Sequence, residues 1–204
     1  MRQDRALNLL RQRWASLSVG LATIFLAGCV TSPAPAPGPG GTLTGKLTVE
    51  WVRENRFIYR PDAKDPLTFL TTDGRRITPR IMYTNGGSIP PILQPIPGFS
   101  PWGYAPAYIV HDWLFEQHHC NYAGAEEISF DDSARILGEV IDTVMHLGLA
   151  PMNPPARSLI EAGVRTPIAR QLWDTGKCDT PQPAVLRAAP RGTPILQLDY
   201  SVKR

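Results

Sequence analysis

The chain has 204 residues and a formal net charge of +3, a length that suits one domain of ordinary size. Residues 1–28 hold four arginines and one aspartate, so the rest of the chain carries 17 basic and 17 acidic side chains. Residues 29–204 are thus neutral and contain no run of like charge. They lack the basic surface that nucleic-acid binding needs, so we expect no nucleic-acid partner.

The first 28 residues have the three parts of a secretory signal peptide. Residues 2–13 form a positively charged lead, residues 14–25 form an apolar run, and small residues follow. An uncleaved transmembrane anchor is the alternative, but the apolar run is shorter than the roughly 20 residues that a membrane span needs. We therefore expect this segment to be removed.

The tetrapeptide Leu26-Ala27-Gly28-Cys29 is similar to the lipobox of bacterial lipoproteins. The resemblance implies that Cys29 is lipidated, becomes the first residue of the mature chain and anchors it on the periplasmic side of a bacterial membrane. Val30, rather than an aspartate, follows the cysteine, and in Gram-negative lipoproteins this favours passage to the outer membrane. Several acyl chains give firm anchoring, so a lipid bilayer is the expected partner of Cys29.

A proline-rich spacer separates this cysteine from the part of the chain with strand and helix patterns. Residues 31–41 read TSPAPAPGPGG, a composition that cannot form a core and favours an extended tether of about 3.1 Å per residue. We expect the lipidated cysteine and its tether over residues 29–44, a globular domain over 45–178 and a tail over 179–204.

The globular part begins with strand patterns. Residues 46–59 alternate unevenly between apolar and polar side chains, and residues 67–71 and 77–83 flank Asp73-Gly74, a strong hairpin signal. Residues 84–101 are rich in glycine and proline and read as a loop. We expect a small N-terminal antiparallel sheet, and a further strand is possible at residues 195–200.

Helical spacing begins after Pro106, a residue that suits the first turn of a helix. A second helix is expected from Ser129 to Gly148, with shorter helical pieces at residues 158–164 and 168–173. The predicted fold is therefore α+β, with the small N-terminal antiparallel sheet packed on a bundle of three or four helices.

Two cysteines, Cys120 and Cys178, remain once the anchor has used the first. An even number of cysteines in an oxidising compartment predicts a disulfide between them. The alternative is that Cys120 ligates a metal beside His118 and His119. A zinc site could also use His111. His111 and His118 share a helix face but stand two turns, about 10 Å, apart, so both could reach one ion only if the helix were bent.

The pair His111-Asp112 is the main candidate for chemistry. Helical spacing places His111 on the apolar face with Val110 and Leu114, where a histidine can be either a core residue or a functional one. A glycine-rich loop precedes the pair, and Asp131 and Asp132 open the next helix.

The loop at residues 84–90, TNGGSIP, followed by Trp102, Ala107 and His111-Asp112-Trp113-Leu114-Phe115, resembles the family catalogued as domain of unknown function 1353. The resemblance covers roughly residues 46–173. Members of that family usually carry an aspartate where this chain has Asn85, and the segment after Asp132 is longer here. The family has no established activity, so the resemblance bears on the fold more than on function.

A second resemblance, to secreted phospholipases A2, rests on the His-Asp pair, the preceding glycine-rich loop and an aspartate 21 residues after the histidine. It implies that His111 is a general base, that Asp132 (or Asp131) orients its imidazole, and that Asp112 with the Gly86-Gly87 backbone holds Ca²⁺. The fuller glycine-rich loop and the disulfides flanking the histidine in that family are missing.

These residues also have structural explanations. Asp132 stands three residues after Ser129 and can complete a capping box at the start of its helix. Gly86-Gly87 can simply allow a tight turn. Two functions follow: a membrane-anchored envelope lipoprotein that acts as a binding or structural module, or a calcium-dependent hydrolase with His111 as its base.

Overall fold

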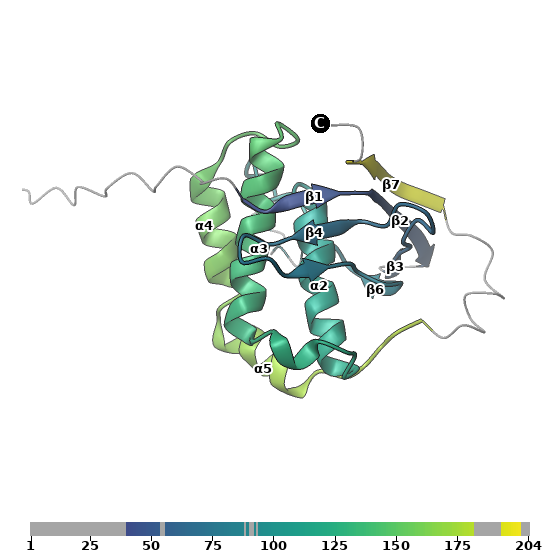
Figure 1. Ribbon diagram of the computed structural model, residues 1–204. Helices are drawn as coiled ribbons and strands as arrows, with labels where there is room; N and C mark the ends of the chain where they lie inside the picture. Colours follow the sequence, from purple (N-terminus) through teal and green to yellow (C-terminus); the bar gives the residue numbers. More distant parts are fainter. Residues whose placement is uncertain are drawn as a thin grey trace, which may run out of the picture. The chain divides into compact units, whose positions relative to one another are not determined.

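A computed structural model describes residues 40–53, 56–87, 89, 92, 94–181 and 193–200. The predicted signal peptide, the lipidation residue Cys29 and most of the expected tether lie outside the described residues. The described chain has an α+β fold, with most strands in its first half and the helices in its second half (Figure 1). This confirms the predicted fold class.

The strands of the described part form two antiparallel sheets rather than the single small sheet that was expected. One has the order β1-β4-β5, with bounds Thr42–Thr44, Thr68–Leu70 and Arg76–Ile77. The other has the order β6-β3-β2-β7, with bounds Met82–Thr84, Arg56–Tyr59, Lys46–Arg53 and Thr193–Asp199.

The division into two sheets follows from the segment after the predicted hairpin. Strands β4 and β5 pair antiparallel around Gly74, which adopts a φ of +88° as the turn requires. The expected strand at residues 77–83 is interrupted, because β5 ends at Ile77 and the segment before β6 includes Pro79. Proline has no N–H to donate to a ladder, and β6 instead pairs with β3 in the other sheet.

The last described strand, β7, confirms the possible strand near the C-terminus. It pairs antiparallel with β2, and the backbone N–H of Tyr200, which follows it, donates to the carbonyl of Gly45 at 2.8 Å. Tyr200 is buried in the core. The folded region therefore begins with β1, before residue 45, and includes part of the expected tail.

Four α-helices and a short 3₁₀ turn lie between β6 and β7 in the described part of the chain. Their bounds are α2 Ala105–His119, η1 Ala125–Glu127, α3 Phe130–His146, α4 Pro154–Gly163 and α5 Pro167–Thr175. Ser129, Asn153 and Thr166 cap three of these helices, because each side chain accepts a backbone N–H of the first turn. None of the described helices combines the length and apolar character that crossing a membrane demands.

The helices are held together by an apolar core and by one covalent link. An apolar stripe of α3, which includes Leu137, Ile141 and Val144 at helical spacing, is buried. Helix α3 packs between α2 and α4 (Figure 1). The predicted disulfide joins Cys120, at the end of α2, to Cys178, beyond α5. A disulfide sulfur is not a thiolate, so Cys120 does not serve as the alternative metal ligand.

Candidate functional site

The candidate pair lies in the second turn of α2, and its two side chains point to different surroundings. Consecutive helical residues project about 100° apart. Asp112 contacts the end of β6, whereas the His111 ring lies beside Phe115, with 4.9 Å between the ring centres. The two residues are neighbours in the chain, but the described contacts do not join them.

Asp112 is connected to the glycine-rich loop through Thr84, the last residue of β6. The Thr84 hydroxyl donates to Oδ2 of Asp112 at 2.7 Å and accepts the backbone N–H of Gly86 at 3.0 Å. Burial raises the pKa of Asp112 to about 7, and the hydrogen bond from Thr84 acts in the opposite direction. The structure therefore brings Asp112 and Gly86 close together, as the calcium hypothesis requires.

The loop itself is shaped by close packing. Gly86 has a φ of +73°, and a Cβ on Gly87 would lie only 2.7 Å from the ring of Tyr108. The N–H of Gly87 donates to the carbonyl of Pro101 at 2.8 Å. A tight turn against α2 thus explains both glycines.

The donor set at this loop fits calcium poorly. Calcium takes six to eight oxygen ligands. The described residues here offer the Asp112 carboxylate and the Thr84 hydroxyl, which are already bonded to each other, and the Gly87 carbonyl accepts the N–H of Ile89 at 2.6 Å. The Gly86 N–H points at Thr84 and is a donor, so it repels a cation.

His111 is half-buried and has one unsatisfied nitrogen. Its Nε2 is buried, and no described residue forms a hydrogen bond with it. Burial lowers the pKa of His111 to about 4, so the imidazole is neutral at pH 7. A neutral, unpartnered imidazole nitrogen can accept a proton as a general base, although leaving it buried costs stability.

The other histidines of α2 hold helix α5 in place. The His118 ring stacks on Trp173 with ring centres 4.1 Å apart, and Nε2 of His119 lies 3.1 Å from the carbonyls of Leu172 and Trp173. These contacts do not bring either ring to His111. The zinc site considered from the sequence is therefore not assembled in the described structure.

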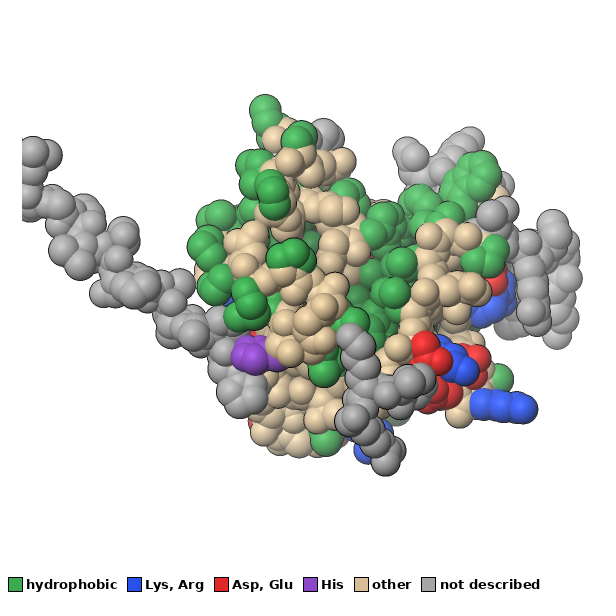
Figure 2. Space-filling model, turned by 90° about the horizontal axis from the view of Figure 1, so that it is seen from above, with side chains coloured by type: hydrophobic (Ala, Val, Ile, Leu, Met, Phe, Trp, Pro, Cys, Tyr) green, Lys and Arg blue, Asp and Glu red, His purple; other side chains and the backbone are tan. Residues whose placement is uncertain are grey.

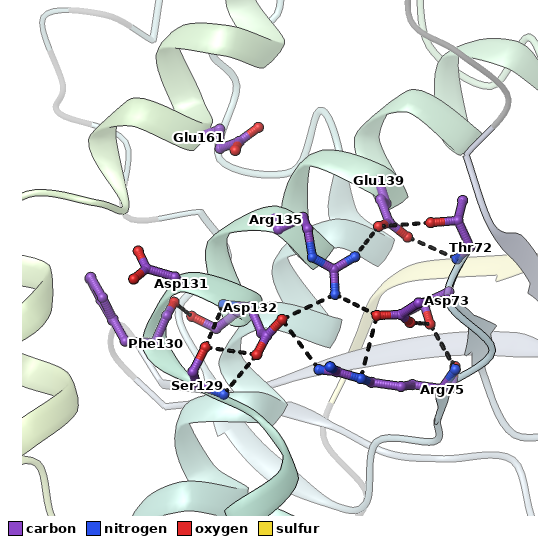
Figure 3. A network of polar contacts seen from close by, with 12 residues as sticks. Thr72, Asp73, Arg75, Ser129, Phe130, Asp131, Asp132, Arg135, Glu139 and Glu161 are labelled. Carbon is purple, nitrogen blue, oxygen red and sulfur yellow. Dashed lines mark hydrogen bonds and ion pairs between the residues drawn. The ribbon is translucent and has the colours of Figure 1, made fainter.

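Asp132 completes the capping box with Ser129 that was considered as its structural role. Its Oδ2 accepts the Ser129 hydroxyl and backbone N–H, and its Oδ1 pairs with Arg135 at 3.2 Å and Arg75 at 3.3 Å (Figure 3). Burial raises the pKa of Asp132, but these hydrogen bonds and charges outweigh it and hold the pKa well below its usual range. The neighbouring Asp131 pairs with Arg165 at 2.8 Å.

Neither aspartate forms a described hydrogen bond to His111. The orienting role that the phospholipase resemblance implies for Asp132 has no contact to support it in the described structure, because its oxygens are engaged by Ser129 and two arginines.

The sequence did not single out two parts of this region. Thr84, the link between Asp112 and the loop, lies 28 residues from its partner. The second is a network across α3 in which Arg135 contacts Asp73, Asp132 and Glu139 (Figure 3). The spacing of Arg135 and Glu139, four residues apart on a helix, was a usable signal for one of these pairs.

Comparisons with known proteins are sparse. The chain matches no protein-family model and no solved structure. Fifty of its residues, 24% of its length, are 42% identical to part of an uncharacterized protein, y4iH, of Sinorhizobium fredii. The match spans about a fifth (20%) of the length of that relative. The resemblance to domain of unknown function 1353 therefore stays a prediction.

Proposed function

We propose that this chain is a lipid-anchored lipoprotein of the bacterial cell envelope, with a folded domain that acts as a binding or structural module. The observation that carries the proposal is the pairing of Cys120 with Cys178. Disulfides persist in oxidising compartments such as the periplasm. The pairing also leaves Cys29, in its lipobox-like context, as the third cysteine of the chain.

The polar contacts favour a module over an enzyme. Asp112 holds the loop after β6 against α2 through Thr84, and Asp132 holds the start of α3 and the β4–β5 hairpin. Each carboxylate that was a candidate for chemistry is thus occupied in linking two elements of the fold. A binding surface displayed by a tether needs neither of them to be free.

The test is acylation in cells. Labelled fatty acid is expected on the wild-type chain and not on Cys29→Ala, which should leave the membrane fraction. Cys178→Ser is the matched control, since it removes a cysteine without touching the anchor and should keep the label. A wild-type chain without label, or a Cys29→Ala chain that still sediments with membranes, contradicts the proposal.

A hydrolase with His111 as base is the second candidate. The observation that favours it is the buried Nε2 of His111, which has no hydrogen-bond partner among the described residues. Purified chain should then hydrolyse phospholipid or simple ester substrates, with and without added Ca²⁺, and His111→Gln should lose that activity. Asp132→Asn serves as the control, because Asp132 does not contact His111 and its loss should spare catalysis. Activity that survives in His111→Gln rules this candidate out.

A further inference from the structure

Helices α4 and α5 and the segment that leads into α4 expose an unusual set of large apolar side chains. The exposed members, with their exposed fractions, are Leu149 (37%), Met152 (56%), Leu159 (62%), Ile168 (73%) and Leu172 (58%). We call this set the uncharged face. Ile168 and Leu172 are four residues apart, so they lie on the same side of α5.

The charged side chains of the same region pair with α3 or with one another. Arg157 pairs with Asp142 at 3.2 Å and with Glu161. Arg165 donates to Asp131 at 2.8 Å. The charged residues between positions 149 and 172 are Arg157, Glu161, Arg165 and Arg170, and α5 also contains Asp174.

Arg170 is also engaged with α3, because its guanidinium lies 4.7 Å from the ring centre of Phe130. Arg170 and Asp174 are exposed, but each lies two residues from Leu172, which places it about 200° away around α5. The side of α5 that carries Ile168 and Leu172 is therefore free of charged side chains. Figure 2 views the molecule from the end where α3 leads into α4, and hydrophobic side chains gather there with few charged ones among them; α5 lies at the opposite end of the helices (Figure 1).

The uncharged face begins close to the point where the tether reaches the domain. The Thr143 hydroxyl, in the last turn of α3, contacts the carbonyl of Gly41 at 3.3 Å. Leu149 follows six residues later. Ten residues, 30–39, separate Gly40 from Cys29, and at no more than about 3.5 Å per residue this stretch spans at most roughly 40 Å. The lipid anchor is thus held within reach of this face.

We propose that the uncharged face rests on the lipid bilayer that holds the anchor, with Leu159, Ile168 and Leu172 inserted among the acyl chains and headgroups. The inference rests on the proposed lipoprotein function, because the anchor supplies the high local concentration of bilayer that a small apolar surface needs. An exposed apolar surface of this kind marks a protein or membrane interaction site, and apolar helical faces bind in the bilayer interface.

Because the uncharged face carries no charged side chains, its contact with a bilayer should differ from the electrostatic contact that basic surfaces make. Basic surfaces bind anionic lipids and release them in salt, because ions screen exposed charges beyond about 10 Å at 0.1 M. Contact through the uncharged face should depend on neither anionic lipid nor ionic strength. This property gives the experiment its second readout.

The test uses the full lipidated chain in vesicles of phosphatidylethanolamine and phosphatidylglycerol, in a ratio of about three to one. Single cysteines at Leu159→Cys and Ile168→Cys carry an environment-sensitive fluorophore, and quenchers are placed on the lipid acyl chains. Lys64→Cys is the matched control, since Lys64 is exposed and belongs to the sheet region. Labels at 159 and 168 should be quenched several-fold more than the label at 64, equally at 0.1 and 1 M salt.

The outcomes distinguish the face from the anchor. A chain that carries acyl groups and floats with the vesicles but shows equal quenching at all three positions overturns the inference and leaves the lipoprotein function standing. A chain without acyl groups contradicts the proposed function instead. Labels at 159 and 168 that are shielded in detergent, in a chain that sediments as a dimer, assign the face to a second copy and likewise overturn the inference.

Discussion

Two adjacent side chains in α2 have pKa values displaced in opposite directions by the same cause. Burial lowers the pKa of His111 from 6.5 to about 4 and raises that of Asp112 from 3.8 to about 7. Both groups are thus driven toward their neutral forms. Their contributions to the free energy of unfolding change in opposite directions over nearly the same pH range. Substituting one of the two residues therefore reveals the pH dependence that the other one causes.

The signs follow from proton binding. Between pH 6.5 and 4 the unfolded chain protonates His111 before the folded chain does, so this residue lowers stability as the pH falls. Between pH 4 and 7 the unfolded chain ionises Asp112 first, so this residue lowers stability as the pH rises. Asp112→Asn should therefore gain stability over wild type as the pH rises to 7, by about 1–3 kcal/mol.

His111→Gln should show the opposite pH dependence. Its free energy of unfolding should rise relative to that of the wild type as the pH falls from 6.5 to 4. Thermal unfolding of the three chains from pH 4 to 8 measures both effects, and subtracting the wild-type curve removes the contribution of other titrating groups. Difference curves that stay flat for both variants would show that neither residue is neutralised by the fold.

The residues of this region could be predicted only in part, for a physical reason. The His-Asp pair and the glycine-rich loop are contiguous patterns, and both were found. Thr84 was not singled out because its role depends on β6 ending beside α2, a tertiary contact between residues 28 positions apart. The ion pair between Asp132 and Arg75 was not predicted either, because it forms only where the β4–β5 hairpin packs against α3.

At the scale of an element, the N-terminus of α3 is the joint between the helices and the three-stranded sheet. Ser129 and Asp132 cap each other, and Asp132 reaches Arg75 in the hairpin. Thr72, in the same hairpin, donates to Glu139, two turns further along α3 than Asp132. This joint combines a local cap with long-range pairs, so the two contributions can be separated by substitution.

Ser129→Ala removes the cap alone and should cost about 1 kcal/mol of unfolding free energy. Asp132→Asn weakens the cap and both arginine pairs at once, and it should cost more, about 1–3 kcal/mol. Asp131→Asn is the matched control: its carboxylate is largely exposed and pairs only with Arg165 in the described structure, so less than about 0.5 kcal/mol is expected.

Denaturant unfolding at pH 7 gives the three values. Equal losses for Asp131→Asn and Asp132→Asn would mean that the joint contributes nothing beyond surface charge, contrary to the geometry.

Some elements of the fold are determined by residues close to them in the sequence. Asp73-Gly74, Pro106 and Ser129 each mark a turn or a helix start within a few residues, and the hairpin, α2 and α3 were predicted from them. The start of α4 at Pro154 was expected four residues later, although Asn153 is a good capping residue. The division into two sheets was not predicted, because an alternating pattern indicates a strand but not which other strand it pairs with.

At the scale of the whole molecule, the two ends of the folded region meet in one sheet. Strand β2 lies between β3 and β7, so residues near the start of the domain pair with residues near its end. The Cys120–Cys178 disulfide holds the intervening segment after α5 to the end of α2. Strand β7 therefore protects the edge of β2, a position at which an unpaired strand invites association with other chains.

Deletion of residues 193–204 should therefore destabilise the whole domain, since it uncovers the β2 edge and removes Tyr200 from the core. We expect a loss of at least about 3 kcal/mol, a melting temperature lower by roughly 10 °C, and oligomers on size-exclusion chromatography. Deletion of residues 201–204 alone keeps β7 and should leave all three readouts unchanged. A monomeric 193–204 deletion with the wild-type melting temperature would show that β7 is an accessory strand, because a strand that closes a sheet cannot be removed without exposing its neighbour.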